Sequence, residues 1–245
     1  SGDHSISLSL NSVGDIMVVG YPTYIYSKGS VVLFRYHNGQ WVGDTGVAQM
    51  VGVNNDQYLG INTSINGAGD IVACNDNMYV KIFKDPDFGN TTDTRWLELI
   101  GDINLYTPNL ALLPYVPRVS LNMAGDIVAT STTLNDFTYL VRVYKNTGTN
   151  TWDQIGGDTI DSGSWISLND AGDVIVVGSP NSYEMKVYNY DITNDVWVPI
   201  PGTYTGDEGS GYGYVVDINH SGTDVVVSEY NTGKVKTYNI SSINT

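Results

Sequence analysis

The side chains that could carry catalysis are sparse in this chain. Glycoside hydrolysis needs two carboxyl groups about 5 to 10 Å apart, in environments that separate their pKa values. Asp217 is a candidate, because it stands in a repeated pattern at a position where the other copies carry Ser9, Ser64, Ser120 and Ser167. We expect it to accept hydrogen bonds from neighbouring hydroxyls or water, with a ligand or ion contact as the alternative. A single carboxylate does not supply the pair, so no catalytic residue is expected.

The remaining reactive groups form no set with the spacing of a metal site. The chain has one cysteine, Cys74, and three scattered histidines, so a transition-metal site lacks its ligands. One acidic stretch has oxygen spacing that resembles a calcium loop, at Asp85, Asp87, Asn90 and Asp93. It lacks the glycine that normally follows and occurs in one copy only, which favours a solvated acidic turn. We therefore expect no metal and no cofactor.

Aromatic side chains are the more informative candidates. The flat faces and polar edges of tyrosine and tryptophan suit sugars and protein partners alike. Together with Asp217 they form the predicted ligand-binding set, whose aromatic members are Tyr21, Tyr24, Tyr26, Trp165, Tyr204 and Tyr212. The alternative is that these rings fill the outer layers of the fold.

Residues 106–117 form an apolar, proline-rich insertion that has no counterpart in the other copies. An exposed apolar patch of this kind indicates a protein contact. The predicted partner interface is Tyr106, Leu110, Leu112, Leu113 and Tyr115. The alternative is that the insertion closes one mouth of a central channel.

These candidates are placed by a unit that occurs five times. Each copy has an alternating apolar run, then Asn-x-x-Gly, then a continuous apolar run and a third run that ends in an aromatic residue. The asparagines are Asn11, Asn66, Asn122, Asn169 and Asn219. Asparagine and glycine tolerate the positive φ of a tight hairpin turn, and the flanking runs are typical of strands. Four copies add a tryptophan, for which we expect a packing role: Trp41, Trp96, Trp152 and Trp197.

A four-stranded unit repeated about every fifty residues predicts a β-propeller. We expect an all-β, five-bladed β-propeller of four-stranded antiparallel blades that forms a single domain over residues 1–245. The blades are expected at approximately 5–50, 58–105, 116–160, 163–205 and 211–240. The last copy is too short for a fourth strand, so the fifth blade lacks its outer strand within this chain. Either residues upstream of Ser1 in a longer chain complete that blade, or it has three strands and an open edge available for self-assembly.

The composition excludes several classes of function. The chain has 245 residues, with 11 Lys and Arg against 26 Asp and Glu and a formal net charge of −15. This balance opposes binding to nucleic acid or to anionic membranes, because both are polyanions. No apolar run reaches the roughly 18 to 20 residues of a membrane span.

The repeat resembles that of the FG-GAP-like, integrin-α-like propellers found in environmental bacteria and some large viruses. The resemblance is carried by Ser120–Val128, Val141–Tyr144 and Trp152–Ile160, with weaker matches in every copy. Integrin-type members bind calcium through an Asp-rich loop between the first two strands, and the hairpins of this chain are too short for it. The resemblance implies an extracellular or particle-surface binding module without catalysis.

Three hypotheses of function follow. The first is a non-enzymatic recognition module at an extracellular, cell or virion surface, which binds glycan or protein partners through loop aromatics. The second is a structural subunit of a virion or surface assembly, held by the apolar insertion and the open edge of the fifth blade. The third is a glycoside hydrolase.

Overall fold

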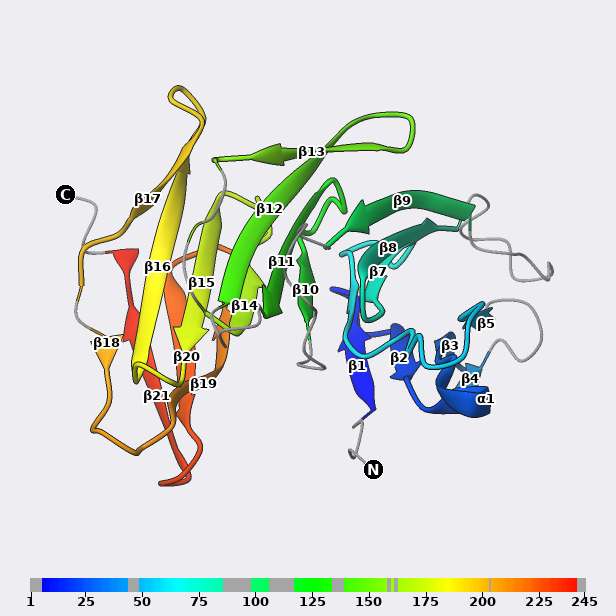
Figure 1. Cartoon of the computed structure of the whole chain (residues 1–245), viewed down its shortest axis with the longest axis horizontal. Coiled ribbons are helices and arrows are strands. Elements are labelled where there is room, and N and C mark those ends of the chain that lie inside the picture. Colours follow the sequence, from blue (N-terminus) through cyan, green and yellow to red (C-terminus); the bar gives the residue numbers. More distant parts are fainter. Residues whose placement is uncertain are drawn as a thin grey trace.

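The computed structural model describes residues 6–43, 49–85, 98–105, 117–133, 139–157, 160, 163–202 and 204–241. Five antiparallel sheets follow one another around a ring in chain order, and the one helix among these residues is a single turn (Figure 1). The chain is therefore a five-bladed β-propeller, as its repeats predict. Across the described residues, no helix has the length and apolar character needed to cross a membrane.

Each blade is a meander whose strands pair in sequence order. Blade 1 consists of β1 (Ser7–Leu10), β2 (Ile16–Tyr21), β3 (Ser30–His37) and β4 (Gln40–Gly43), with α1 (Tyr24–Ser27) before β3, and β5 (Gln49–Val51) also paired to β3. Blade 2 consists of β6 (Thr63–Ile65), β7 (Ile71–Asn75), β8 (Tyr79–Lys84) and β9 (Glu98–Asn104). Blade 3 consists of β10 (Arg118–Leu121), β11 (Ile127–Thr133), β12 (Tyr139–Gly148) and β13 (Thr151–Ile155).

The last two blades differ in their number of strands. Blade 4 consists of β14 (Trp165–Leu168), β15 (Val174–Ser179), β16 (Glu184–Asp191) and β17 (Val196–Pro199), with the short β18 (Tyr204–Thr205) also paired to β16. Blade 5 consists of β19 (Tyr212–Ile218), β20 (Asp224–Glu229) and β21 (Lys234–Asn239). Among the residues that the structure describes, the fifth blade has three strands, as its short repeat predicts.

In blades 2, 3 and 4 the second strand is buried on both faces, which explains its continuous apolar run. In β15, Val176 packs in the core between blades 4 and 5, whereas Val177 packs in the core between blades 3 and 4. Both side chains are fully buried. Successive strand residues point to opposite faces, so a strand between two cores must be apolar at every position.

Each Asn-x-x-Gly segment is a hairpin turn held from inside by its asparagine. Asn122 is 3% exposed. Its side-chain oxygen accepts the backbone N–H groups of Gly125, Asp126 and Ile127 at 3.0, 3.1 and 3.0 Å, and its amide group donates to the Asp126 carboxylate at 2.8 Å. Asn11 and Asn66 make the same four bonds. The repeated Asn, Gly and Asp are therefore parts of one turn.

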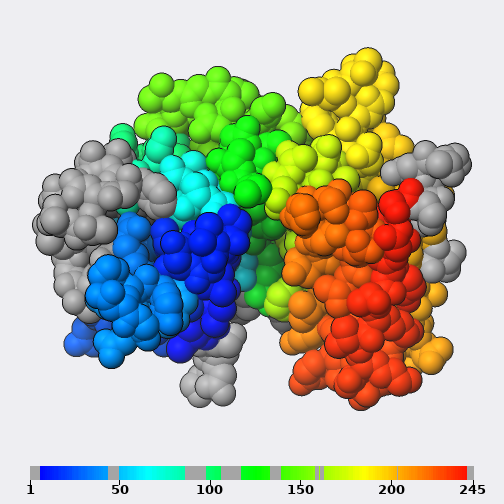
Figure 2. Space-filling model, turned by 180° about the vertical axis from the view of Figure 1, so that it is seen from behind, coloured from blue at the N-terminus to red at the C-terminus, as the bar shows by residue number. Residues whose placement is uncertain are grey.

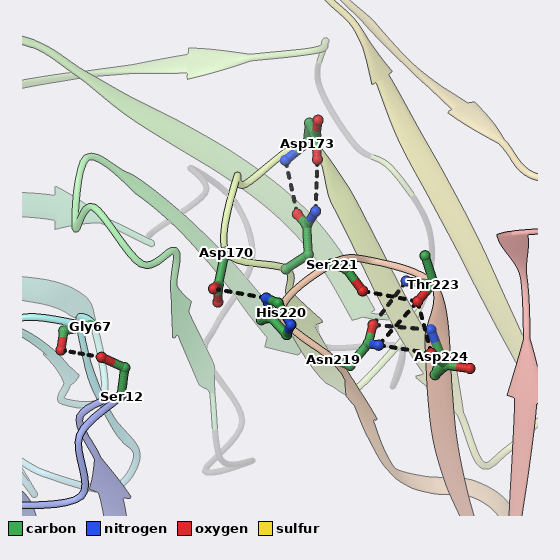
Figure 3. A network of polar contacts seen from close by, with 10 residues as sticks. Ser12, Gly67, Asp170, Asp173, Asn219, His220, Ser221, Thr223 and Asp224 are labelled. Atoms are coloured by element: carbon green, nitrogen blue, oxygen red, sulfur yellow. Dashed lines mark hydrogen bonds and ion pairs between the residues drawn. The ribbon is translucent and has the colours of Figure 1, made fainter.

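In blades 2 to 5 the glycine of the turn packs against the blade before it. Gly125 has a φ of 76°, and a Cβ at this position would lie 2.9 Å from Cδ1 of Ile71. Backbone bonds also run from turn to turn, with Met123 donating to Asp170 at 3.1 Å and Asp170 donating to His220 at 3.1 Å. Figure 3 shows the end of this chain of contacts, where the Asp170 carboxylate also meets the His220 ring. The turns thus form a continuous band that joins the blades.

The tryptophan of a fourth strand also packs against the preceding blade. The Trp152 indole Nε1 donates to the Ile100 carbonyl at 3.0 Å. A Cβ on Gly101 would lie 2.6 Å from that nitrogen, so glycine is what leaves room for the ring. Trp197 lies against Gly156 in the same way and is 8% exposed. The predicted packing role is confirmed for these two tryptophans.

The face of the first blade that corresponds to these junctions is not covered by another described blade, and its apolar residues are exposed. Leu8 and Leu10 are 64% and 49% exposed, and Trp41 is 40% exposed. The residues that stand in place of Leu10 in the other blades are at most 8% exposed: Ile65, Leu121, Leu168 and Ile218. Figure 2 shows the blue first blade and the orange-to-red fifth blade as separate bodies with a furrow between them.

The asparagine turn gives a direct prediction of stability. Asn122→Ala is expected to lower the free energy of unfolding by about 2 to 4 kcal/mol, because three backbone N–H groups inside the turn lose their acceptor. Urea denaturation followed by circular dichroism measures this loss. The control is Asn194→Ala, whose amide lies in an exposed turn and donates to Asp191 at 2.7 Å. That change should cost less than about 0.5 kcal/mol, and equal losses in the two variants would contradict the role of Asn122.

Candidate active site

Three inner strands bring a cation and two aromatic rings together away from the asparagine turns, and a third ring, Tyr230, joins them from the end of β20. Arg118 begins β10, and its guanidinium carbon lies 3.7 Å from the centre of the Trp165 ring. Trp165 begins β14, and its ring lies 6.1 Å from that of Tyr214 on β19. Tyr214 in turn stacks on Tyr230, with ring centres 4.6 Å apart and planes inclined by 28°. We call these four residues the arginine–aromatic cluster.

Arg118 carries its charge without a carboxylate partner within the described part of the chain. Burial lowers the pKa of its guanidinium to about 10, and the nearby Tyr214 and Tyr139 act in the opposite direction. The group is therefore protonated at neutral pH. A cation that has lost much of its water attracts an anion more strongly than one in bulk solvent, because the local dielectric constant is lower. Arg118 is thus suited to bind a carboxylate or phosphate group.

A layer of small polar side chains lies beside the cluster along the same strands. Arg118 and Ser120 are two residues apart on β10, and Trp165 and Ser167 are two residues apart on β14. Residues two apart share one face of a strand and are separated by about 7 Å. The arrangement therefore consists of a cation–aromatic layer and a hydroxyl layer, separated by roughly the length of one sugar ring.

The path of β19 is irregular where this strand supplies Tyr214. Its pairing with β20 shifts register between Tyr212 and Val216. Gly213 has a φ of 85°, and a Cβ there would lie 2.4 Å from the Glu184 carbonyl oxygen. Both the positive φ and the close approach require glycine. Gly213 therefore fixes the course of the strand from which Tyr214 reaches the cluster.

The serines of the hydroxyl layer join neighbouring blades. The Ser120 hydroxyl accepts the backbone N–H of Leu168 in the next blade at 3.0 Å. At the last junction the Ser167 hydroxyl instead donates to the Asp217 carboxylate at 2.7 Å, and Asp217 also accepts the N–H of Ile218 at 3.0 Å. The prediction that Asp217 accepts a hydrogen bond from a neighbouring hydroxyl is confirmed. Asp217 is exposed, so its carboxylate can still contact water or a ligand.

Two tyrosines of the predicted ligand-binding set lie inside the protein. Tyr204 and Tyr212 are 7% and 0% exposed and belong to the apolar core between blades 4 and 5. The hydroxyls of Tyr212 and Tyr238 lie 3.2 Å apart. Burial raises the pKa of Tyr212 well above its ordinary value. These rings fill a core, which is the alternative that the sequence left open.

The other three tyrosines of the set belong to the first blade. Tyr21 ends β2 and is partly buried, whereas Tyr24 and Tyr26 on α1 are 41% and 81% exposed. Within the described ranges no ring contact joins them to Trp165. The structure therefore brings Trp165 and Asp217 to adjacent inner strands and leaves these tyrosines elsewhere.

Several predicted residues lie outside the described part of the chain. They are the partner-interface residues Tyr106, Leu110, Leu112, Leu113 and Tyr115, together with Trp96 and the calcium-like positions Asp87, Asn90 and Asp93. Asp85 is described, and its carboxylate pairs with the Arg35 guanidinium at 3.0 Å. Where side chains are described, no group of three or more His, Cys, Asp or Glu could hold a metal ion.

The predicted ligand-binding set contains none of Arg118, Tyr214 and Tyr230. The serines of the repeated pattern and Asp217 stand two residues before the asparagine of each copy. Extending the same register by two residues places Arg118 in the layer of Trp165, and that spacing was available from the sequence. The contribution of Tyr214 and Tyr230 was not available, because it depends on the irregular course of β19.

Comparisons with known proteins identify the fold. No family model and no curated protein matches the chain. It is similar to a solved structure of a candidate 6-phosphogluconolactonase from Bacteroides uniformis, with 14% identity, a TM-score of 0.57, and coverage of 82% of this chain and 55% of the other. A second such candidate, from Bacteroides fragilis, shows 13% identity, a TM-score of 0.58 and coverage of 83% and 55%. The chain thus spans about half the length of these proteins, and the likeness is one of fold.

These neighbours correct the predicted function. We expected a non-enzymatic recognition module, but the solved structures that share the fold carry the name of an enzyme. The same finding contradicts the prediction that the chain is not an enzyme. The resemblance to FG-GAP-like repeats gains no support from a family model and stays a prediction.

The lack of a described partner for Arg118 predicts an unusual mutational response. Arg118→Met is expected to leave the free energy of unfolding unchanged or to raise it by up to about 1 kcal/mol, because a desolvated charge without a counter-ion is replaced by an apolar side chain. Urea denaturation of the two proteins at neutral pH measures the difference. A loss of more than about 2 kcal/mol would show that Arg118 is a structural residue.

Proposed function

We propose that the chain is a hydrolase whose substrate is a sugar lactone that bears an anionic group. The observation that carries this proposal is Arg118, a charged guanidinium held on the Trp165 ring with no carboxylate partner within the described residues. In a chain with a net charge of −15, such a cation is a local exception. It is suited to recognise a phosphate or carboxylate by paired N–H contacts.

The aromatic members of the cluster support a sugar as the body of the substrate. Trp165 and Tyr214 offer ring faces beside the cation. Aromatic faces pack against the apolar face of a sugar ring, while the polar edge of the ring keeps a hydrogen-bond partner. The anionic group would lie on Arg118 and the sugar ring beside Trp165.

Asp217 supplies a general base for the reaction. Its exposed carboxylate is oriented by the Ser167 hydroxyl at 2.7 Å. In the proposed step, Asp217 takes a proton from a water molecule, and the oxygen of that water forms a bond to the lactone carbonyl carbon. The ring C–O bond then breaks, and the leaving alkoxide takes up a proton to give the open hydroxy acid. A positioned carboxylate base typically contributes about 100- to 10,000-fold to such a proton transfer.

The neighbouring structures are consistent with this substrate class. The name 6-phosphogluconolactonase denotes an enzyme that acts on a lactone with a phosphate group. Such a substrate has an anion at one end and the reacting carbonyl at the other, which matches the two layers of the inner strands. Because the chain spans only about half of those proteins, their activity comes to this chain as a proposal alone.

The test is lactone hydrolysis with and without the phosphate group. We expect the protein to open a phosphorylated gluconolactone faster than gluconolactone. Arg118→Met should lower kcat/KM for the phosphorylated gluconolactone about 10- to 100-fold and leave kcat/KM for gluconolactone nearly unchanged. Asp217→Asn should lower kcat for both substrates about 100-fold or more. Acid release in a pH-stat follows the reaction.

The matched control is Arg35→Met, which removes a guanidinium that is paired to Asp85 in the first blade. Arg35→Met should leave the rates of hydrolysis of both lactones unchanged. If the folded protein opens neither lactone faster than buffer does, the proposed function is wrong. Turnover that survives Asp217→Asn at full rate would overturn the role of this carboxylate alone.

A further inference from the structure

The two ends of the chain carry faces that match each other. The first-blade face consists of Leu8, Leu10 and Trp41, which are apolar and 64%, 49% and 40% exposed. In later blades the residues at the positions of Leu8 and Leu10 are buried, as Ile166 and Leu168 are at 6% and 7%. The first blade thus carries the residues of a blade junction, and no described blade buries them.

The internal junctions show what covers these positions. Ile166 and Leu168 pack in one core with Ala129, Val141 and Val143 of the preceding blade. These three belong to β11 and β12, the middle strands of that blade. The face that carries a leucine pair therefore meets small and β-branched residues of two middle strands.

The next junction repeats this arrangement with other residues. Val216 and Ile218 of blade 5 pack with Val176, Met185 and Val187 of blade 4. The covering residues again come from two middle strands, β15 and β16. Both junctions join the same two kinds of face in the same order along the chain.

A covering face of the same kind is exposed on the last blade. The fifth-blade face consists of Val226, Val235 and Thr237 on β20 and β21. Val226 pairs with Thr237 in the register in which Val176 pairs with Val187, so these three stand where blade 4 has Val176, Met185 and Val187. Val235 is 66% exposed and Thr237 is also exposed, whereas Val226 is partly buried. The chain therefore presents a leucine face at one end and its cover at the other.

The two faces do not meet within one copy of the protein. Leu8, Leu10 and Val235 remain exposed, and Figure 2 shows the furrow that separates their blades. We propose that two copies associate head to tail, with the first-blade face of one copy packed on the fifth-blade face of the other. The contact joins unlike surfaces, so it either closes a ring of copies or extends into a longer assembly. Its occupant is a second copy of this chain, because the fifth blade of that copy carries Val226, Val235 and Thr237 at the positions that cover such a face at the described junctions.

Light scattering on protein separated by size tests this association. We expect the wild-type protein to exceed the mass of one chain at high micromolar concentration. Leu10→Asp and Val235→Asp should each give the mass of one chain, because a buried unpaired carboxylate opposes either half of the contact. The control is Ile192→Asp, at a turn position that is 76% exposed and lies on neither face. It should leave the assembly unchanged.

Mixing the two variants makes the test specific. Leu10→Asp keeps an intact fifth-blade face and Val235→Asp keeps an intact first-blade face, so an equimolar mixture should form a pair of one copy each. Circular dichroism should show the wild-type fold in both, since the substituted residues are exposed. A wild-type mass of one chain at every concentration overturns the proposal. So does an assembly that Leu10→Asp abolishes and Val235→Asp does not, because that result means contact between two first blades.

Discussion

An asparagine amide inside each hairpin turn, buried in the first four blades, is the interaction on which the rest of the propeller depends. In Asn122 a single oxygen satisfies three backbone N–H groups that would otherwise face the interior. The turn can then lie against the preceding blade, where Gly125 leaves no room for a side chain beside Ile71. Because the backbone bonds of one turn lead to the next, the turns join neighbouring blades at this end of the molecule. The opposite ends of the inner strands take no part in this band of turn-to-turn bonds.

The two ends of these short inner strands therefore have different roles. The turn end stabilises the fold, and the opposite end is where the chemistry is proposed. Ser120 and Ser167 each stand one residue before the leucine and two residues before the asparagine of their repeat. Their hydroxyls nevertheless belong to the region where the chemistry is proposed. Arg118 and Trp165 lie two residues further from the turn. The strongly negative net charge repels anions at long range, so the recognition of an anionic group has to come from short-range contact with Arg118.

The features that could be predicted from the sequence are the ones that recur from blade to blade. The turns, the buried second strands and the tryptophan contacts are local patterns that recur, so the five blades could be predicted without a structure. The inner ring of serines was visible for the same reason. Tyr204 and Tyr212 could not be placed, because their burial depends on how blade 5 packs against blade 4. The arginine–aromatic cluster draws its members from three blades, and the position of Tyr214 depends on a shift of register at Gly213 that no repeat pattern contains.

The serine contacts between blades have a consequence for how such a protein can change in length. The Ser64 hydroxyl accepts a hydrogen bond from the backbone N–H of Leu121, and the Ser120 hydroxyl accepts one from that of Leu168. The donor–acceptor distance is 3.0 Å in both cases. Since the two junctions use the same atoms, a duplicated blade inserted between them would find a ready-made contact on each side. The number of blades is therefore not encoded by any individual junction. Evolution by tandem duplication or loss of whole repeats would need no new interface, and only the residues of the first and last blades would have to adapt.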